Sequence, residues 1–397
     1  MNFIFRFFQK PIFLDKKFVI SIWFIIPLIA GIKHATRGVF NDYLIFKSVF
    51  YHTIEQVNLY LLYPELNGDS NHYGPIFSIV FAPFALMPDW IGTLLWEFAM
   101  AAVLFIAIYK LPMIWKAKAI IFYLLLQGLY SNAVNSETNT LIAALVIGSF
   151  ICIRSGKDFW AACFITLGLF IKLYGIVGLA FFFFSKHKPR LILSVIFWSV
   201  VFFVLPMIIS SPGFIVQCYY DWFEALTDKN GLNICSLNQD MSVMGLIRKT
   251  TGNLDIPNIP ILIGGISLFA LQYLNIKSYN NLAYQLGILA STLLFVVLFS
   301  TGSEPCTYVI AMSGVAIWFV LQKRPYSKGV IILIVFGLLL TFAISGLSPS
   351  FIRKEIIKPY ALIVIPYLFV WLVLVYQLIT FREQKTNSIS KNYLYDK

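Results

Sequence analysis

Long apolar runs without alternating polar residues are the feature that most constrains how this chain folds. Residues 18–34, 90–109 and 361–380 are examples. Inside a lipid bilayer, every backbone N–H and C=O group must be paired within its own segment or within a closed barrel. Barrel strands alternate apolar and polar residues, and these runs do not. We therefore expect transmembrane helices.

Composition also favours a membrane protein. The chain has 397 residues, of which 59% are hydrophobic and 12% are charged, whereas soluble proteins carry roughly 25% charged residues. We predict an all-α polytopic membrane protein with about 12 transmembrane helices. Residues 1–381 are expected to form this transmembrane domain, and residues 382–397 a polar cytoplasmic tail. The apolar segments are 18–34, 74–88, 90–109, 119–131, 138–153, 158–171, 174–185, 190–210, 257–276, 282–300, 307–322, 329–345 and 361–380.

The net charge of +12 fits the excess of Lys and Arg in cytoplasmic loops of membrane proteins. A basic stripe interleaved with aromatic residues would indicate nucleic-acid binding, and none is visible, so we predict no nucleic-acid partner. The opposite side of the membrane then receives residues 35–73 and 211–256, which are expected to form a catalytic face. The clusters expected in the cytoplasm are Lys10/Lys16/Lys17, Lys110/Lys116/Lys118, Arg154/Lys157, Lys186/Lys188/Arg190, Lys323/Arg324/Lys328 and Arg382/Lys385.

One part of this topology is inconsistent. The charge pattern between residue 34 and Lys110 allows one net crossing, yet it contains two apolar segments, 74–88 and 90–109. Either residues 74–88 enter the membrane and return, or the charge rule fails at residues 110–118.

The five cysteines show no Cys/His spacing typical of a metal site. Cys218 and Cys235 share one hydrophilic loop, so a disulfide between them is possible if that loop is extracytoplasmic. No cluster of carboxylates that would hold a divalent metal is apparent, and no nucleotide-binding fingerprint is present. We predict no cofactor.

An acid follows the first apolar run, in the stretch Gly38-Val39-Phe40-Asn41-Asp42-Tyr43. A carboxylate at a membrane boundary can act as a general base on a lipid-linked substrate if the attacking hydroxyl lies within its reach. The alternative is that Asp42 caps a helix running through residues 43–50, because Asp is a favoured N-cap residue.

Aromatic and proline residues follow Asp42 in a fixed order. Interfacial aromatics and helix-ending prolines would explain their composition but not their order, which resembles glycosyltransferase family 87. That resemblance implies a GT-C membrane enzyme that uses a polyprenyl-phosphate sugar, typically polyprenyl-phosphate mannose. The segments that carry it are Asp42-Tyr43, Leu59-Tyr60, Tyr73-Gly74-Pro75-Ile76-Phe77, Ala82-Pro83-Phe84-Ala85-Leu86-Met87-Pro88 and Leu95-Trp96.

Later segments extend the resemblance over residues 38–250, and more loosely to 320. Residues 127–139 are similar to a polar amide segment of the family, residues 168–174 to its Lys-containing stretch, and residues 236–248 to its Asn-Gln-Ser…Arg segment. Residues 302–308 depart from it, because relatives often have histidine there. Glu304 or Tyr308 is expected to take that place.

The resemblance implies inverting transfer of a hexose, with mannose expected, to an acceptor hydroxyl at the extracytoplasmic face. Asp42 is then the catalytic base. The expected partners are the polyprenyl-phosphate sugar, a glycolipid or glycan acceptor, and the lipids of the cell membrane that the protein spans.

Other polar residues are candidates for substrate binding, each with an alternative. Lys172 and Arg248 could neutralise the donor phosphate, or be a snorkelling lysine and a solvated loop charge. Glu137 and Glu304 could touch substrate, cap helices or form salt bridges. The residues expected to bind sugar or acceptor are Tyr73, Asn238, Gln239 and Tyr308.

A late basic cluster, Arg353, Lys354 and Lys358, is either the face of a surface helix or an attractor for an anionic lipid head.

Two rival functions remain open at this stage. A transporter of lipid-linked saccharide should show inverted repeats, and none is convincing. An O-antigen polymerase or ligase should carry essential arginines in a large late loop, but residues 211–256 contain only Arg248.

Overall fold

Helices are the only regular elements in the part of the chain that the computed structural model describes, residues 10–64, 66 and 68–382, apart from the Cys235 side chain. The predicted all-α class is confirmed. Most of the predicted tail lies outside the described residues. The helices of the first half are η1 (Pro11–Leu14), α2 (Lys16–Arg37), α3 (Asp42–Glu55), α4 (Phe77–Ala85), α5 (Asp89–Tyr109), α6 (Trp115–Ala133), α7 (Asn139–Arg154), α8 (Asp158–Ile171) and η2 (Leu173–Phe184).

The second half continues in the same way, and α12 to α16 follow the predicted apolar segments closely. Its helices are α9 (Lys188–Val204), η3 (Leu205–Ile208), α10 (Pro212–Cys235), α11 (Val243–Thr251), α12 (Asn258–Leu271), η4 (Gln272–Leu274), η5 (Ile276–Ser278), α13 (Leu282–Leu298), α14 (Tyr308–Leu321), α15 (Lys328–Ile344), the π-helix η6 (Ile352–Ile357) and α16 (Val364–Ile379).

Three described helical segments are long and apolar enough to cross a membrane: residues 16–37, 89–109 and 188–208. Shorter apolar helices of 10–17 residues accompany them. Together they mark a membrane protein, since a bilayer crossing needs roughly 20 apolar residues and shorter helices must rely on neighbours. The figure of about 12 spans stays a prediction.

The length of α4 favours one of the two explanations for the conflict in the charge pattern. This helix has nine residues, so its length is about 13 Å at 1.5 Å per residue, far short of the roughly 30 Å hydrocarbon core. The helix α5 has 21 residues and is long enough to cross. One crossing between residues 34 and 110 is therefore consistent with the positive clusters.

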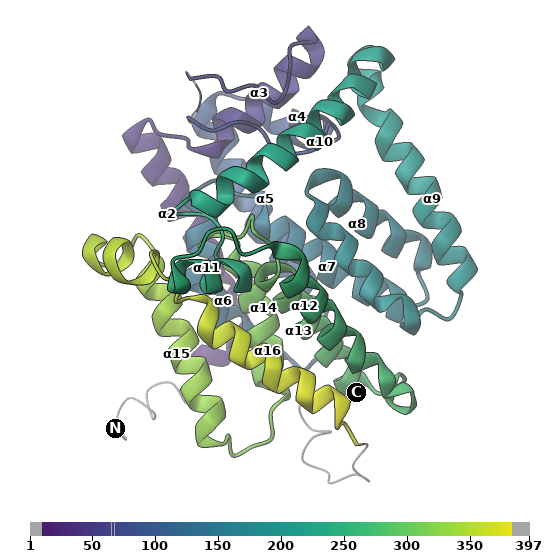
Figure 1. Cartoon of the computed structure of the whole chain (residues 1–397), viewed down its shortest axis with the longest axis vertical. Coiled ribbons are helices and arrows are strands. Elements are labelled where there is room, and N and C mark those ends of the chain that lie inside the picture. Colours follow the sequence, from purple (N-terminus) through teal and green to yellow (C-terminus); the bar gives the residue numbers. More distant parts are fainter. Residues whose placement is uncertain (1–9, 65, 67, 383–397) are drawn as a thin grey trace.

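The segment 211–256, expected to be a hydrophilic loop, contains two helices instead. Ser211 accepts a hydrogen bond from the backbone of Phe214 and begins α10, and Ser242 accepts one from Gly245 and begins α11. Figure 1 shows α10 crossing one end of the molecule beside α3 and α4. Serine caps of this kind are a local signal that the segment's overall polarity obscures.

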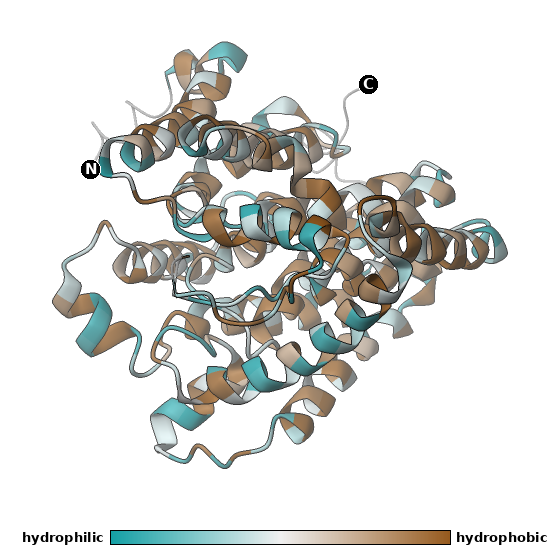
Figure 2. Cartoon of the chain, turned by 90° about the horizontal axis from the view of Figure 1, so that it is seen from above, coloured by the Kyte–Doolittle hydropathy of each residue, from teal (hydrophilic) through white to brown (hydrophobic). Residues whose placement is uncertain are grey.

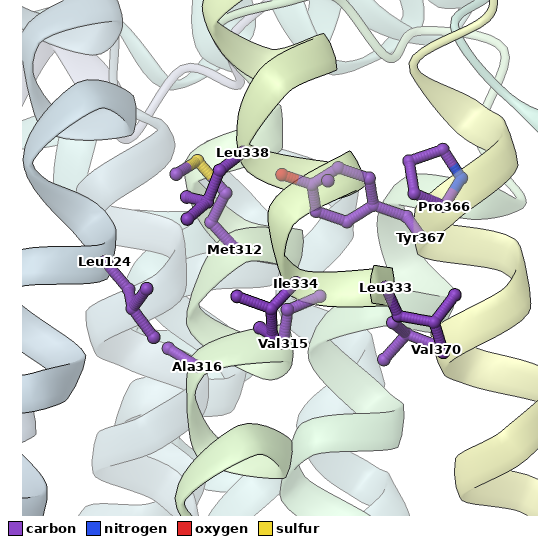
Figure 3. A pocket seen from close by; sticks show the side chains of 11 residues that line it. Leu124, Met312, Val315, Ala316, Leu333, Ile334, Leu338, Pro366, Tyr367 and Val370 are labelled. Atoms are coloured by element: carbon purple, nitrogen blue, oxygen red, sulfur yellow. The ribbon is translucent and has the colours of Figure 1, made fainter. Parts of the chain in front are cut away.

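The core runs through α7, α8, α13 and α14, which pack on one another in pairs. Figure 2 shows hydrophobic residues along most helices and hydrophilic residues in patches on a few of them. A small apolar cavity of about 20 Å³ remains between α6, α14, α15 and α16. Figure 3 shows Leu124, Met312 and Val370 among the side chains around it. Its lining is apolar apart from Tyr367, whose hydroxyl is paired with Thr341.

Candidate active site

Asp42 is the first residue of α3, and Asn41 stands before it as the cap residue without a side-chain capping bond. The alternative that Asp42 is the N-cap is therefore wrong by one position. Asn41 has φ 50° and ψ −133°, a region that costs of order 1–3 kcal/mol and needs support from its surroundings. The Asn41 side chain supplies some of that support by donating a 2.6 Å hydrogen bond to the backbone of Val134.

The ordered aromatic residues hold α3 against α4 and α5. Tyr43 donates a hydrogen bond to the backbone of Phe84 over 2.9 Å. It passes so close to Gly92 that a Cβ there would lie 2.0 Å from the Tyr43 hydroxyl. One turn on, the Phe46 ring meets Tyr73 edge-on with a centroid distance of 5.0 Å. The ordered aromatic residues therefore pack α3, the helix that begins with Asp42, against its neighbours.

Lys172 lies at the break between α8 and η2, where its backbone is extended. The two helices meet through glycine, since a Cβ on Gly175 would lie 2.2 Å from the carbonyl carbon of Gly168. Gly74 donates a backbone hydrogen bond to Ile171 over 3.2 Å. These close approaches explain why Gly74 and Gly168 stand in the two sequence motifs, residues 73–77 and 168–174. They also set Lys172 beside Tyr73, whose ring centroid is 5.7 Å from the ammonium nitrogen of Lys172.

A cavity of about 280 Å³ opens among these elements. We call it the catalytic cavity. Six of the residues singled out from the sequence line it, and they come from six separate segments of the chain. They are Asp42, Tyr73, Glu137, Lys172, Gln239 and Glu304.

Glu137 is the centre of the hydrogen bonding in this cavity. It is 6% exposed, and one carboxylate oxygen accepts hydrogen bonds from Tyr73 and from Asn139, both over 3.3 Å. Burial and the neighbouring Glu137 raise the pKa of the Tyr73 phenol well above its usual value, so the phenol remains a donor. Asn132 donates to the Glu137 backbone over 2.8 Å, which explains the amide-rich segment before α7.

Glu304 faces the same space from the loop before α14. Gln239 donates to its carboxylate over 2.8 Å. Burial, and then repulsion from Glu137, raise the pKa of Glu304 to about 7. Burial alone would lower the pKa of the Lys172 amine, but Glu137 and Glu304 more than offset this and the net pKa is raised. The Lys172 amine is therefore a cation in the cavity that it shares with both acids, and it donates to Asn139 over 3.3 Å.

Cys306 connects the two glutamates. Its thiol lies 3.6 Å from a Glu137 oxygen and 3.8 Å from a Glu304 oxygen, and these three residues offer ligand atoms within 4.8 Å of one another. The expectation that carboxylates do not cluster is wrong, because folding unites residues that are far apart in sequence. Buried carboxylates need hydrogen bonds or a compensating charge. Tyr73 and Asn139 donate to Glu137, Gln239 donates to Glu304, and Lys172 lines the same cavity.

Several polar cavity residues were missed by sequence reasoning. Asp69 forms a 3.0 Å salt bridge with Lys229 of α10, and both line the cavity with His72 and Asn233. Burial, followed by Lys229, lowers the pKa of His72 to about 4, so its imidazole is neutral at pH 7. His72 precedes the Tyr73 motif and could have been recognised, whereas the contact with α10 has no sequence signal.

Three predicted site residues lie elsewhere. Arg248 is 1% exposed and forms a 2.9 Å salt bridge with Asp240, so it is not the solvated loop charge considered from the sequence. Tyr308 is buried and donates to the backbone of Met241 over 2.9 Å. Asn238 lines a neighbouring, more basic cavity.

The disulfide considered possible between residues 218 and 235 is not formed, because Cys218 is a free thiol. Cys218 is instead buried with Val49, Leu59, Tyr60 and Trp222 in a small apolar cluster, to which α10 contributes Cys218 and Trp222. A cysteine often fills such a position as a small apolar side chain.

Comparison with known proteins identifies the family of this chain. The family model for glycosyltransferase family 87 matches residues 71–345, well over half of the chain. A comparison with curated proteins gives no match. With the match covering the catalytic cavity from Tyr73 to Glu304, the chain belongs to glycosyltransferase family 87 and is a membrane glycosyltransferase.

Proposed function

We propose that this enzyme has a GT-C fold and transfers a hexose, with mannose the expected sugar, from a polyprenyl-phosphate donor to an acceptor hydroxyl, with Asp42 as the general base. The observation that carries the proposal is the position of Asp42 in the wall of the catalytic cavity, a few residues past the end of the apolar helix α2. A carboxylate there is in a position to meet both a lipid-linked sugar and a hydroxyl.

The proposed reaction is a single displacement. Asp42 takes the proton of the acceptor hydroxyl as its oxygen bonds to the anomeric carbon, and the bond from that carbon to the phosphate oxygen breaks. The configuration inverts. The lipid leaves as a phosphate monoester, which carries one negative charge more than the phosphodiester of the donor. Nearby cations stabilise such developing charge.

The other cavity residues receive the sugar and acceptor in this proposal. Tyr73 and Gln239 can bind hydroxyl groups. Glu137 and Glu304 can accept hydrogen bonds from sugar hydroxyls, and Lys172 supplies a cation in the same cavity. Arg248 has no part in the reaction, because its guanidinium group is already bound by Asp240 and by the backbone of Ile256.

We place this cavity on the extracytoplasmic side of a multi-pass protein of the cell membrane. The helix α2 has 22 residues and is about 33 Å long, which matches the hydrocarbon core. Lys16 and Lys17 stand at its first end, where cytoplasmic lysines are expected, and Asp42 lies just past the other end.

The test is reconstitution of the purified protein with polyprenyl-phosphate mannose and candidate glycolipid acceptors, followed by mass spectrometry and NMR of the product. The expected product has one more hexose and an anomeric configuration opposite to that of the donor. Moved but unmodified lipid would indicate a transporter. A ladder of saccharide lengths would indicate a polymerase. Either result would exclude the proposed reaction.

A further inference from the structure

A second cavity of about 640 Å³ adjoins the catalytic cavity, and Glu304 lines both. We call it the basic chamber. The catalytic cavity has four carboxylates in its wall and two lysines, whereas the basic chamber has five lysine and arginine side chains and the single carboxylate of Glu304. The five cationic side chains are Lys33, Arg37, Arg353, Lys354 and Lys358.

These cations come from distant parts of the sequence. Lys33 and Arg37 lie in the last two turns of α2, and the other three belong to η6 and the residue after it. If the late basic cluster were only the solvated face of a surface helix, cations from a second, distant helix would not be expected beside it. Folding brings two basic clusters, more than 300 residues apart, to one chamber.

The chamber cations are poorly neutralised by the protein itself. Arg353 donates to the backbone of Ser345 over 3.0 Å, and Lys358 donates to the side chain of Asn238 over 2.5 Å. Among the described residues, none of the five forms an ion pair with a carboxylate. Burial, and then Arg353, lower the pKa of Lys358. The ends of α2, α6 and α15 lie here, and their dipoles offset only part of this charge.

We propose that the basic chamber binds the phosphate group of a lipid. The hydrogen-bond donors of the chamber are suited to phosphate. A guanidinium group can bind two phosphate oxygens at once, and each lysine adds a positive charge. The location of the chamber favours a lipid. Ile344, the last residue of the apolar helix α15, lines the chamber. Ile32, which precedes the chamber residue Lys33 in α2, is 54% exposed.

The inference deepens the proposed function and rests on it for the relation between the two cavities. A phosphate in the basic chamber would share Glu304 with the sugar site, whereas Asp42, Asp69 and Glu137 line only the catalytic cavity. The shared chemistry is a lipid phosphate, which has two possible sources. One is the phosphate of the polyprenyl donor and product, and the other is the phosphodiester head of an anionic phospholipid or glycolipid acceptor.

The test is a binding measurement in neutral detergent micelles with the full chain. The probes are polyprenyl phosphate and phosphatidylglycerol, with polyprenol and phosphatidylcholine as lipids without net negative charge, and binding is followed by native mass spectrometry. The variant is Arg37→Gln/Lys354→Gln, which removes two exposed chamber cations. The matched control is Lys186→Gln/Arg190→Gln, which removes one lysine and one arginine, also exposed, outside both cavities.

The chamber variant should lose roughly tenfold or more in affinity for a phosphate-bearing lipid, since each basic group near an anionic lipid contributes substantially. The control variant and both lipids without net charge should change little. A loss for polyprenyl phosphate assigns the chamber to the donor, and a loss confined to phosphatidylglycerol assigns it to an acceptor or membrane lipid. Equal binding of both phosphate lipids by the variant and the control would overturn the proposal.

Lipid binding and sugar transfer are separable in this design. Asp42→Asn should abolish transfer and leave polyprenyl phosphate binding unchanged. If that variant transfers sugar normally, the catalytic proposal fails while the binding result still decides the basic chamber. A thermal unfolding curve for each variant confirms that the protein compared is folded.

Discussion

Replacing Arg248 by methionine should destabilise the fold rather than weaken substrate binding. The Arg248 guanidinium donates to Asp240 over 2.9 Å and to the backbone of Ile256 over 2.9 and 2.6 Å, and it also donates to Asn258. Both members of the salt bridge have side chains that are 1% exposed. Removing one partner leaves the other charge buried and unpaired, which typically lowers the free energy of unfolding by 3–5 kcal/mol.

The effect should reach the catalytic cavity through the backbone. Asp240 donates a backbone hydrogen bond to Thr301, and Met241 donates one to Ser303, so this salt bridge supports the loops that carry Gln239 and Glu304. The measurement is equilibrium unfolding in detergent for Arg248→Met, Asp240→Leu and the double variant.

The double variant is the control. If the pair is structural, replacing both charges by apolar groups should recover a large share of the stability lost in either single variant. An Arg248→Met protein as stable as the wild type, with a raised KM for the donor, would refute this reasoning and restore Arg248 as a phosphate ligand.

Two further predictions concern the catalytic cavity and the packing of α3. Because folding raises the pKa of Glu304 to about 7, the folded state holds this proton more tightly. The contribution is complete below about pH 4.5 and is lost as pH rises through 7, which lowers stability by up to about 3 kcal/mol. Glu304→Gln should remove that part of the pH dependence of unfolding, and an unchanged slope would contradict it. Gly92→Ala would place a Cβ 2.0 Å from Tyr43 and should cost about 1–3 kcal/mol. Gly264→Ala, which meets nothing within 4 Å, should be neutral in the same melts, and equal effects would show that α3 tolerates the shift.

The sequence predicts helices best where one physical rule dominates. Apolar length locates the transmembrane helices because the bilayer leaves the backbone few alternatives. It was less informative for residues 74–88, where a break at Leu86–Pro88 shortens α4. Within 211–256, serine caps and not hydropathy mark the helices.

The candidate site could be predicted only in part. Asp42, Tyr73 and Lys172 stand in motifs with their own order and reach one cavity. The pairing of Arg248 with Asp240 could not be foreseen, since nothing local distinguishes a buried arginine from a loop charge. The union of Glu137 with Glu304 depends on how α7 and α14 pack, which no single-sequence pattern encodes.

The measurement that tests the central claim most directly is the turnover of Asp42→Asn with polyprenyl-phosphate mannose. Asparagine keeps the size of the side chain and removes the base, so the rate should fall at least roughly 100-fold while donor binding is retained. Asp228→Asn, the same chemical change at an exposed position of α10 outside the cavity, should stay near the wild-type rate. Turnover of Asp42→Asn close to that of the wild type would contradict the account.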